Sequence, residues 1–151
     1  VVEPVAYRRD LAKSLGADVT INSMETDPVE AIRKLTHGEG ADATIDCTGI
    51  PEPRLQMIKS ARIFGRACFV GEGPSIAPSL NPSADIIHKQ LTIRGSWTMS
   101  TIGLAEVANY VVDHKVPLTK IITHRFPLEQ APEAYKLFES GQTGKVVITW
   151  P

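Results

Sequence analysis

The chain has 151 residues, of which 42% are hydrophobic, a composition typical of a globular domain with an apolar core. Its 16 Lys and Arg residues nearly balance its 17 Asp and Glu residues, so no net positive field favours a nucleic-acid partner or an anionic membrane surface. No apolar run approaches the roughly 20 residues that a membrane-spanning helix needs, and we expect a cytoplasmic protein with no membrane partner.

Strand and helix patterns alternate through the first two thirds of the chain. The apolar pair Val1 and Val2, followed by Glu3, is typical of the end of a strand. Helices are predicted where apolar residues recur at helical spacing between capping residues, and strands where β-branched residues cluster. In chain order the prediction is a helix at 6–15, a strand at 18–22, a helix at 29–36, a strand at 41–47, a helix at 51–61, a strand at 65–70, a short helix at 83–89 and a strand at 91–94.

This alternation predicts an α/β fold with a Rossmann-like, doubly wound parallel sheet in a three-layer αβα sandwich. The apolar strands at 42–47, 66–70 and 91–95 are predicted to run parallel and to be buried on both faces. Ligands of such sheets bind at the carboxyl ends of the strands. The residues that close the predicted strands are therefore site candidates: Glu3, Thr48, Gly49, Val70, Gly71, Ser96 and Trp97.

The last third of the chain has a different pattern. A helix is predicted at 104–114, and a second one at 130–140 precedes a β-rich run at 145–150. The stretch 71–82 contains several Pro and Gly residues, which predicts a loop and the most mobile segment of the chain.

The cysteines and histidines show no metal-binding pattern. Cys47 and Cys68 lie in apolar strand-like runs without C-x-x-C spacing, which predicts buried, reduced thiols. The four histidines lack the spacing of metal ligands, and surface or structural roles are favoured for all of them: His37, His88, His114 and His124. No metal ligand is therefore assigned in this chain.

Several sequence blocks, taken in their order, resemble one known family. They lie at residues 11–18, 40–49, 65–71, 91–97, 127–135 and 141–145. The chain resembles the medium-chain dehydrogenase/reductase superfamily, closest to its zinc-dependent alcohol and polyol dehydrogenase branch. The resemblance covers nearly the whole chain. It implies an incomplete dinucleotide-binding Rossmann domain at 1–97 and, at 98–151, a C-terminal return segment of the catalytic domain.

The resemblance also implies a reaction. Enzymes of this branch transfer hydride between an alcohol and NAD, with zinc stabilising the alkoxide. The family's glycine-rich pyrophosphate turn and its zinc-binding domain would precede Val1, so we expect this chain to be the C-terminal portion of such an enzyme. No catalytic residue is assigned in it. By itself the chain is expected to show no alcohol dehydrogenase turnover and to bind NAD weakly or not at all.

The same resemblance places the adenosine half of the cofactor. It implies that Glu3 accepts hydrogen bonds from the ribose hydroxyls, and this carboxylate would repel the 2′-phosphate of NADP, so NAD is favoured. Arg8 matches a basic position on the adenosine side. A guanidinium there, or that of Arg9, can also bind a 2′-phosphate, so dual cofactor use stays open. Cys47, Thr48 and Gly49 would line the adenine side, although Gly49 equally fits a tight turn.

The nicotinamide half is implied at the next two strand ends. Val70, Ser96 and Thr98 match positions whose main-chain groups hold the carboxamide, with Gly71 beside them, and Lys145 matches a basic position that reaches the pyrophosphate.

Two other functions and one partner are also considered. A zinc-free quinone or enoyl reductase that uses NADPH would keep the fold, although the acidic Glu3 argues against it. A non-catalytic nucleotide-binding or oligomerisation module is the other alternative. The apolar strand at 91–95 is predicted to lie at the edge of the sheet and to pair across a two-fold axis, which would give a homodimer.

Overall fold

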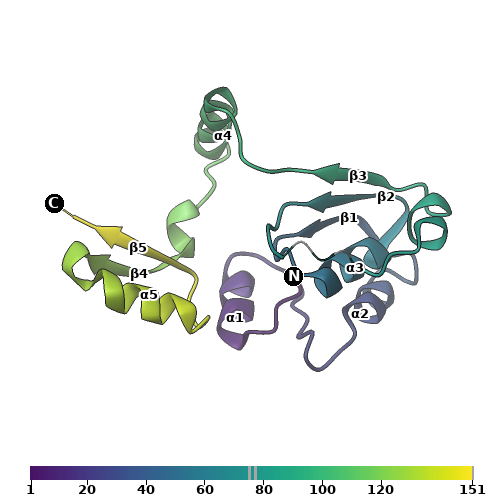
Figure 1. Cartoon of the computed structure of the whole chain (residues 1–151), viewed down its shortest axis with the longest axis horizontal. Helices are drawn as coiled ribbons and strands as arrows, with labels where there is room; N and C mark the ends of the chain where they lie inside the picture. Colours follow the sequence, from purple (N-terminus) through teal and green to yellow (C-terminus); the bar gives the residue numbers. More distant parts are fainter. Residues whose placement is uncertain (75, 77, 151) are drawn as a thin grey trace. The chain divides into compact units, whose positions relative to one another are not determined.

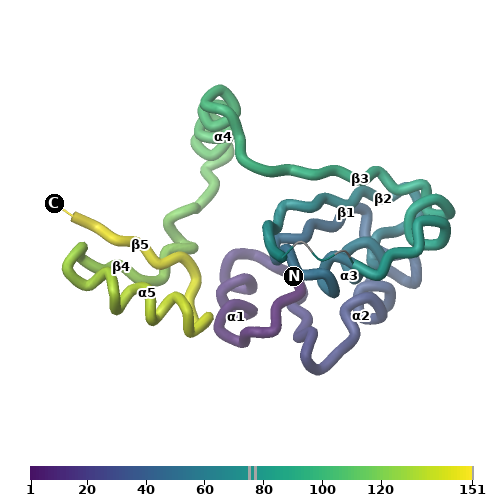
Figure 2. Tube along the Cα trace, in the orientation of Figure 1, coloured from purple at the N-terminus to yellow at the C-terminus, as the bar shows by residue number. Residues whose placement is uncertain are grey.

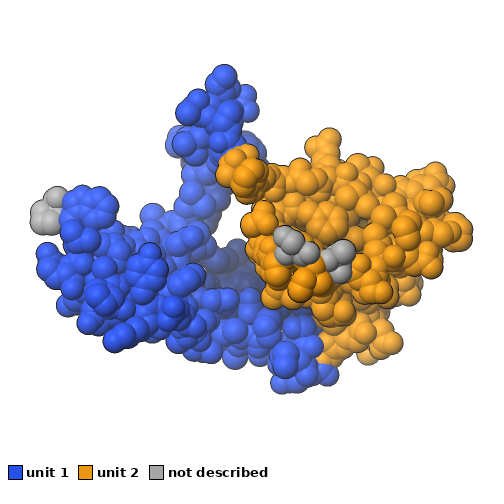
Figure 3. Space-filling view, in the orientation of Figure 1, with its two compact units in different colours: residues 1–25, 99–151 blue, residues 26–98 orange. Residues whose placement is uncertain are grey.

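The computed structural model describes residues 1–74, 76 and 78–150. They form two compact units, one made of residues 1–25 and 99–151 and the other of residues 26–98 (Figure 3). The predicted domain boundary between residues 97 and 98 stays a prediction. The loop predicted to be mobile, 71–82, includes residues 75 and 77, which lie outside the described residues. Among the described helices, none has both the length and the apolar character needed to span a bilayer.

A three-stranded parallel sheet is the centre of the unit at residues 26–98. Its strands β1 (Ala41–Asp46), β2 (Ala61–Phe69) and β3 (Thr92–Gly95) lie in the order β1-β2-β3. Both strand pairs are parallel, which confirms the predicted α/β class with parallel strands. In the register, Asp46 lies opposite Phe69, and Phe69 lies opposite Gly95. The carboxyl ends of all three strands therefore meet at one edge of the sheet.

Two helices and a π-helical turn pack in this unit. Asp27 caps α2 (Pro28–Leu35) by accepting hydrogen bonds from the first amides of the helix, as the sequence predicts. Helix α2 packs on α3 (Pro51–Ser60), and α3 packs on β1 and β2 (Figure 1). The short helix predicted at 83–89 is the π-helical turn η1 (Pro82–Ile87). The buried hydrophobic residues of this unit include Leu55 and Ala61 and the packed cluster of Met57, Ile58 and Ala67.

The sheet face opposite α3 is largely exposed across residues 26–74, 76 and 78–98, so the prediction that the strands are buried on both faces is wrong for this sheet. Side chains alternate along a strand, so Ala67 faces α3 whereas Cys68 and its register partner Ile45 face the other side, where Ile45 is 65% exposed. The prediction that both cysteines are buried is therefore wrong. Cys68 is half-buried on this open face, and Cys47 is exposed because it lies beyond the end of β1.

The second unit combines both ends of the chain. Helix α1 (Ala6–Ser14) and the C-terminal segment belong to it, as the purple and yellow parts of the trace show (Figure 2). A two-stranded parallel sheet pairs β4 (Ile122–Pro127) with β5 (Lys145–Thr149), and α5 (Ala131–Glu139) contacts both strands. The remaining elements of this unit are α4 (Thr101–Asp113), η2 (Leu118–Ile121) and η3 (Leu128–Gln130).

The strand predicted at 18–22 is reduced to one parallel bridge between Val2 and Ile21. The amide of Ile21 donates to the carbonyl of Val1, and the amide of Glu3 donates to the carbonyl of Ile21. The next amide on this side of the strand, that of Val5, donates to the carboxylate of Glu3 at 2.9 Å, so the ladder ends at Glu3.

Candidate functional site

The carboxyl ends of the three strands of the sheet gather most of the predicted site residues. The amides of Val70 and Gly71 both donate to the carbonyl of Asp46, at 3.0 and 2.9 Å, and the amide of Ser96 donates to the carbonyl of Phe69 at 2.9 Å. Each strand end is thereby hydrogen-bonded to its neighbour. Seven of the ten predicted cofactor-binding residues belong to this unit: Cys47, Thr48, Gly49, Val70, Gly71, Ser96 and Thr98.

A cavity of about 320 Å³ lies at the ends of β2 and β3. Its lining residues are Arg54, Phe69, Val70, Gly71, Glu72, Gly95, Ser96 and Trp97. The amides of two lining residues, Val70 and Ser96, already donate within the sheet edge, so of their main-chain groups only the carbonyl oxygens could bind a ligand.

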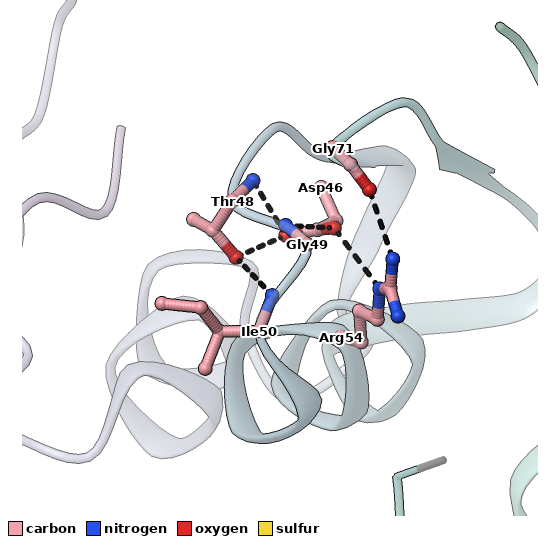
Figure 4. Close-up of polar contacts among 6 residues, drawn as sticks. All are labelled: Asp46, Thr48, Gly49, Ile50, Arg54 and Gly71. Carbon is pink, nitrogen blue, oxygen red and sulfur yellow. Dashed lines mark hydrogen bonds and ion pairs between the residues drawn. The ribbon is translucent and has the colours of Figure 1, made fainter. Parts of the chain in front are cut away.

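A polar cluster shapes the turn after β1 (Figure 4). Asp46 accepts hydrogen bonds from the amide and hydroxyl of Thr48, at 3.0 and 2.7 Å, and from the amide of Gly49 at 3.1 Å. The Thr48 hydroxyl in turn accepts from the amide of Ile50, the residue that caps α3. Arg54 on α3 lies with its Nε 3.6 Å from Asp46 Oδ2 and donates from Nη2 to the carbonyl of Gly71 at 2.9 Å. Sequence reasoning identified neither Asp46 nor Arg54 as a site residue.

The environment of Asp46 keeps its carboxylate ionised. Burial raises the pKa of Asp46, but the hydrogen bonds from Thr48 and Gly49 and the charge of Arg54 together outweigh it. The pKa of Asp46 is thus lowered from its ordinary value of 3.8. At neutral pH the cluster contains a carboxylate facing a guanidinium.

Gly49 and Gly71 are required where the turns after β1 and β2 touch. Gly49 has a φ of 74°, and a Cβ on it would overlap the main chain of Glu72. A Cβ on Gly71 would overlap the main chain of Cys47, Thr48 and Gly49. Both glycines therefore permit contact between two segments of the protein backbone.

The other three predicted residues belong to the unit formed by the two chain ends. Arg8 and Lys145 line one cavity of about 380 Å³, and Arg8 Nε donates to the carbonyl of Thr143 at 3.0 Å. Thr143 also lines this cavity, and its buried hydroxyl has no hydrogen-bond partner among the described residues. Glu3 lies elsewhere in this unit, where its carboxylate accepts from the amide of Val5 at 2.9 Å.

The comparisons with known proteins identify the family. Residues 1–114 match the model of a family described as zinc-binding dehydrogenase. The chain belongs to this family. A relative from Escherichia coli (strain K12), an uncharacterized zinc-type alcohol dehydrogenase-like protein, is 38% identical over 99% of this chain and 42% of its own length. An L-threonine 3-dehydrogenase from Symbiobacterium thermophilum is 37% identical over 94% of this chain and 41% of its own length.

Solved structures agree with the assignment to the medium-chain dehydrogenase/reductase superfamily. An alcohol dehydrogenase from Thermotoga maritima matches with a TM-score of 0.85 at 30% identity, over 98% of this chain and 42% of that chain. An alcohol dehydrogenase from Thermus sp. ATN1 matches with a TM-score of 0.87 at 27% identity, over 98% of this chain and 43% of that one. The chain thus spans about 42% of the length of the relatives it matches.

The residues of this zinc-binding dehydrogenase segment do not fit a zinc ion. Across residues 1–74, 76 and 78–150, no three His, Cys, Asp or Glu side chains come together as a metal site. Cys68 lies in β2 and Cys47 directly follows β1, but neither has a histidine or carboxylate set around it that could hold zinc. No step of the chemistry is therefore assigned to a metal held by these residues.

The contact between the two turns predicts a large effect of Gly49→Ala on stability. An alanine must adopt a left-handed conformation and also displace the main chain of Glu72, so we expect a loss of at least about 3 kcal/mol of unfolding free energy. Gly38→Ala is the matched control, because Gly38 has a φ of 95° but nothing within 4 Å of an added Cβ. Its expected loss is about 1–2 kcal/mol. Urea unfolding followed by circular dichroism measures both, and equal losses would contradict the turn contact.

The lowered pKa of Asp46 predicts an acid-dependent stability. Because the folded-state pKa is below the unfolded value of 3.8, the contribution of Asp46 is fully present above that value and is lost as pH falls through the folded pKa. The difference in unfolding free energy between the wild type and Asp46→Asn should be largest at pH 7 and shrink below about pH 4. Asp42→Asn is the control, since the Asp42 side chain is 77% exposed and its pair with Arg62 should contribute little. If the difference in unfolding free energy between the wild type and Asp46→Asn stays constant down to pH 3, Asp46 does not have this role.

Proposed function

We propose that this chain is the NAD(H)-binding portion of an alcohol or polyol dehydrogenase that transfers hydride between an alcohol and NAD. The observation that carries the proposal is the convergence of three parallel strand ends on one edge, with a cavity at the ends of β2 and β3. When bound, the cofactor supplies the hydride acceptor or donor. The residues of this chain bind and orient it. The alcohol substrate itself belongs to the whole enzyme.

The cavity fits the nicotinamide carboxamide. This amide needs acceptors for its NH₂ group and a donor for its oxygen. The carbonyls of Val70 and Ser96 are the proposed acceptors, since the amides of these residues are already bonded to the carbonyls of Asp46 and Phe69. The resemblance implies a main-chain contact from Thr98 as well, and its amide is the proposed donor. All three groups belong to the main chain, so their positions depend on the backbone at the strand ends.

The adenosine half is assigned to the turn after β1, where Cys47, Thr48 and Gly49 present main chain and small side chains. Glu3 is the proposed partner of the adenosine ribose and favours NAD over NADP. Arg8 and Lys145 line a cavity of their own unit and are the proposed cationic contacts of the adenosine and pyrophosphate groups. The unpartnered hydroxyl of Thr143 beside them supplies a further donor.

Two alternatives remain distinct from this proposal. A zinc-free quinone or enoyl reductase would prefer NADPH, which the Glu3 carboxylate disfavours. A non-catalytic nucleotide-binding or oligomerisation module would keep the cofactor site without the reaction.

The relatives named L-threonine 3-dehydrogenase suggest a secondary alcohol as the substrate class of the whole enzyme.

The proposal predicts where the cofactor binds and which cofactor binds better. Titration of the ¹⁵N-labelled chain with NADH should shift the amide resonances of Thr48, Gly49, Gly71 and Ser96, even where the affinity is low. NADPH should bind roughly fivefold more weakly, because its 2′-phosphate approaches the Glu3 carboxylate. Glu3→Gln should reduce this preference, whereas Glu25→Gln, at an exposed position, should not. Resonances that move only far from the strand ends, or a preference for NADPH, would contradict the proposal.

A homodimer through β3 is the proposed assembly. Strand β3 is the end strand of the three-stranded sheet, and Ile93 and Trp97 near its free edge are 38% and 78% exposed. An apolar edge strand of this kind pairs readily with a second copy. Sedimentation equilibrium should show a dimer for the wild type and for Ile87→Lys, whose position is exposed on η1, but a monomer for Ile93→Lys. A monomeric wild type at high concentration would refute the assembly.

A further inference from the structure

We infer that Asp46 and Arg54 are positioning residues that join the turn after β1 to the turn after β2 and so set the distance between the two halves of the cofactor site. This pair is called the Asp46–Arg54 clamp below. The inference rests on the proposed function, in which the first turn meets the adenosine half of the dinucleotide and the second meets the nicotinamide half. The clamp itself need not touch either half.

The clamp acts on both turns at once. The two carboxylate oxygens of Asp46 hold the amides of Thr48 and Gly49, which fixes the first turn. Arg54 bridges to the second turn, with Nε 3.6 Å from Asp46 Oδ2 and Nη2 donating to the Gly71 carbonyl at 2.9 Å (Figure 4). The contact with Gly71 is a hydrogen bond, whereas the contact with Asp46 is an ion pair, because Arg54 Nε has no hydrogen-bond partner among the described residues. A planar guanidinium holds its nitrogens in a rigid fork, so one side chain can reach both turns.

The carbonyl of Gly71 is held by the Arg54 side chain and not by the main-chain hydrogen bonds at the sheet edge. Hydrogen bonds from Val70 and Gly71 to the carbonyl of Asp46 fix the base of the second turn. Arg54 fixes the carbonyl of Gly71 one step farther along the chain, where it lines the cavity. The Asp46 side chain is 1% exposed and that of Arg54 is 18% exposed, so their attraction is little screened by solvent.

The spacing of the two turns matters because the dinucleotide is one molecule. Once one half is bound, the other half meets its own subsite at a high effective concentration, provided that the two subsites have the correct separation. If one turn is displaced, the bound dinucleotide loses this high effective concentration. A half that binds alone still makes the same contacts with its own turn. The clamp therefore contributes to the affinity for the linked dinucleotide and not to that for its separate halves.

The experiment compares the intact cofactor with its halves. Dissociation constants for NADH and for its two halves, adenosine 5′-monophosphate and reduced nicotinamide mononucleotide, are measured by amide-resonance titration of the full chain. Arg54→Met should weaken NADH binding at least about fivefold and change the affinity for either half by less than about twofold. Arg54→Lys keeps the charge but not the fork and should give a smaller loss. Arg62→Met is the matched control, because Arg62 pairs with the exposed Asp42.

Each other outcome overturns the inference in a recognisable way. Unchanged NADH binding by Arg54→Met would leave the proposed function intact and refute the clamp. If Arg54→Met weakens the binding of one half as much as it weakens the binding of NADH, Arg54 contacts that half directly and is not a positioning residue. If Arg54→Met does not fold, the same comparison of NADH with its halves is made with Arg54→Lys. If neither variant folds, Asp46 and Arg54 serve folding alone and the inference is wrong. Of the two outcomes expected from the sequence, weak binding or none, the proposed function requires weak binding. A wild type that binds neither NADH nor its halves would therefore refute the proposed function, and the inference with it.

Discussion

The contact between the turns after β1 and β2 is the constraint on which the arrangement of the site depends. Glycine at 49 and 71 lets the two main chains touch, and any side chain at either position would occupy space that the other turn fills. Because the strands are in register, this contact occurs at the edge where all three of them end. Because glycine has no side chain at these two positions, the main-chain groups of both turns lie close together, where a small ligand can bind them. The ionised carboxylate of Asp46 is placed where it can hold the amides of one of these turns.

The sheet of the unit at residues 26–98 is buried on one face only, which makes the polar contacts at its strand ends more important for this unit. Its core cluster lies between α3, which contributes Met57 and Ile58, and the sheet, which contributes Ala67, whereas Ile45 on the opposite face is 65% exposed. A sheet with one covered face gains less from the hydrophobic effect than one covered on both faces. The strand ends are consequently defined by directional interactions, namely the amides on the Asp46 carbonyl, the amides on its carboxylate and the bridge from Arg54.

The sequence predicted the elements that depend on local pattern and missed those that depend on register. The parallel strands, the capped helix α2 and the gathering of strand ends follow from periodicity and connection rules. Strand β2 begins at Ala61 and not at residue 65, because Phe64 takes a φ of 59° at a register shift, a bulge that Gly65 alone does not reveal. Asp46 had a local signal, an Asp two residues before Thr48 and three before Gly49, as in an Asx turn. Arg54 had none, since its partner Gly71 is 17 residues away and reaches it only through the folded sheet.

The charges around the cavity indicate which part of a dinucleotide it suits. The guanidinium of Arg54 is paired with the carboxylate of Asp46, and Glu72 adds a negative charge to the same lining. Such a wall has no net positive charge to offer a phosphate, but its main-chain carbonyls suit an amide, and the ring of oxidised nicotinamide is itself a cation. A diphosphate needs uncompensated cations and amide donors. This difference supports the proposed assignment of the pyrophosphate to Arg8 and Lys145 and not to Arg54, because no carboxylate lies among the residues that line the cavity of Arg8 and Lys145.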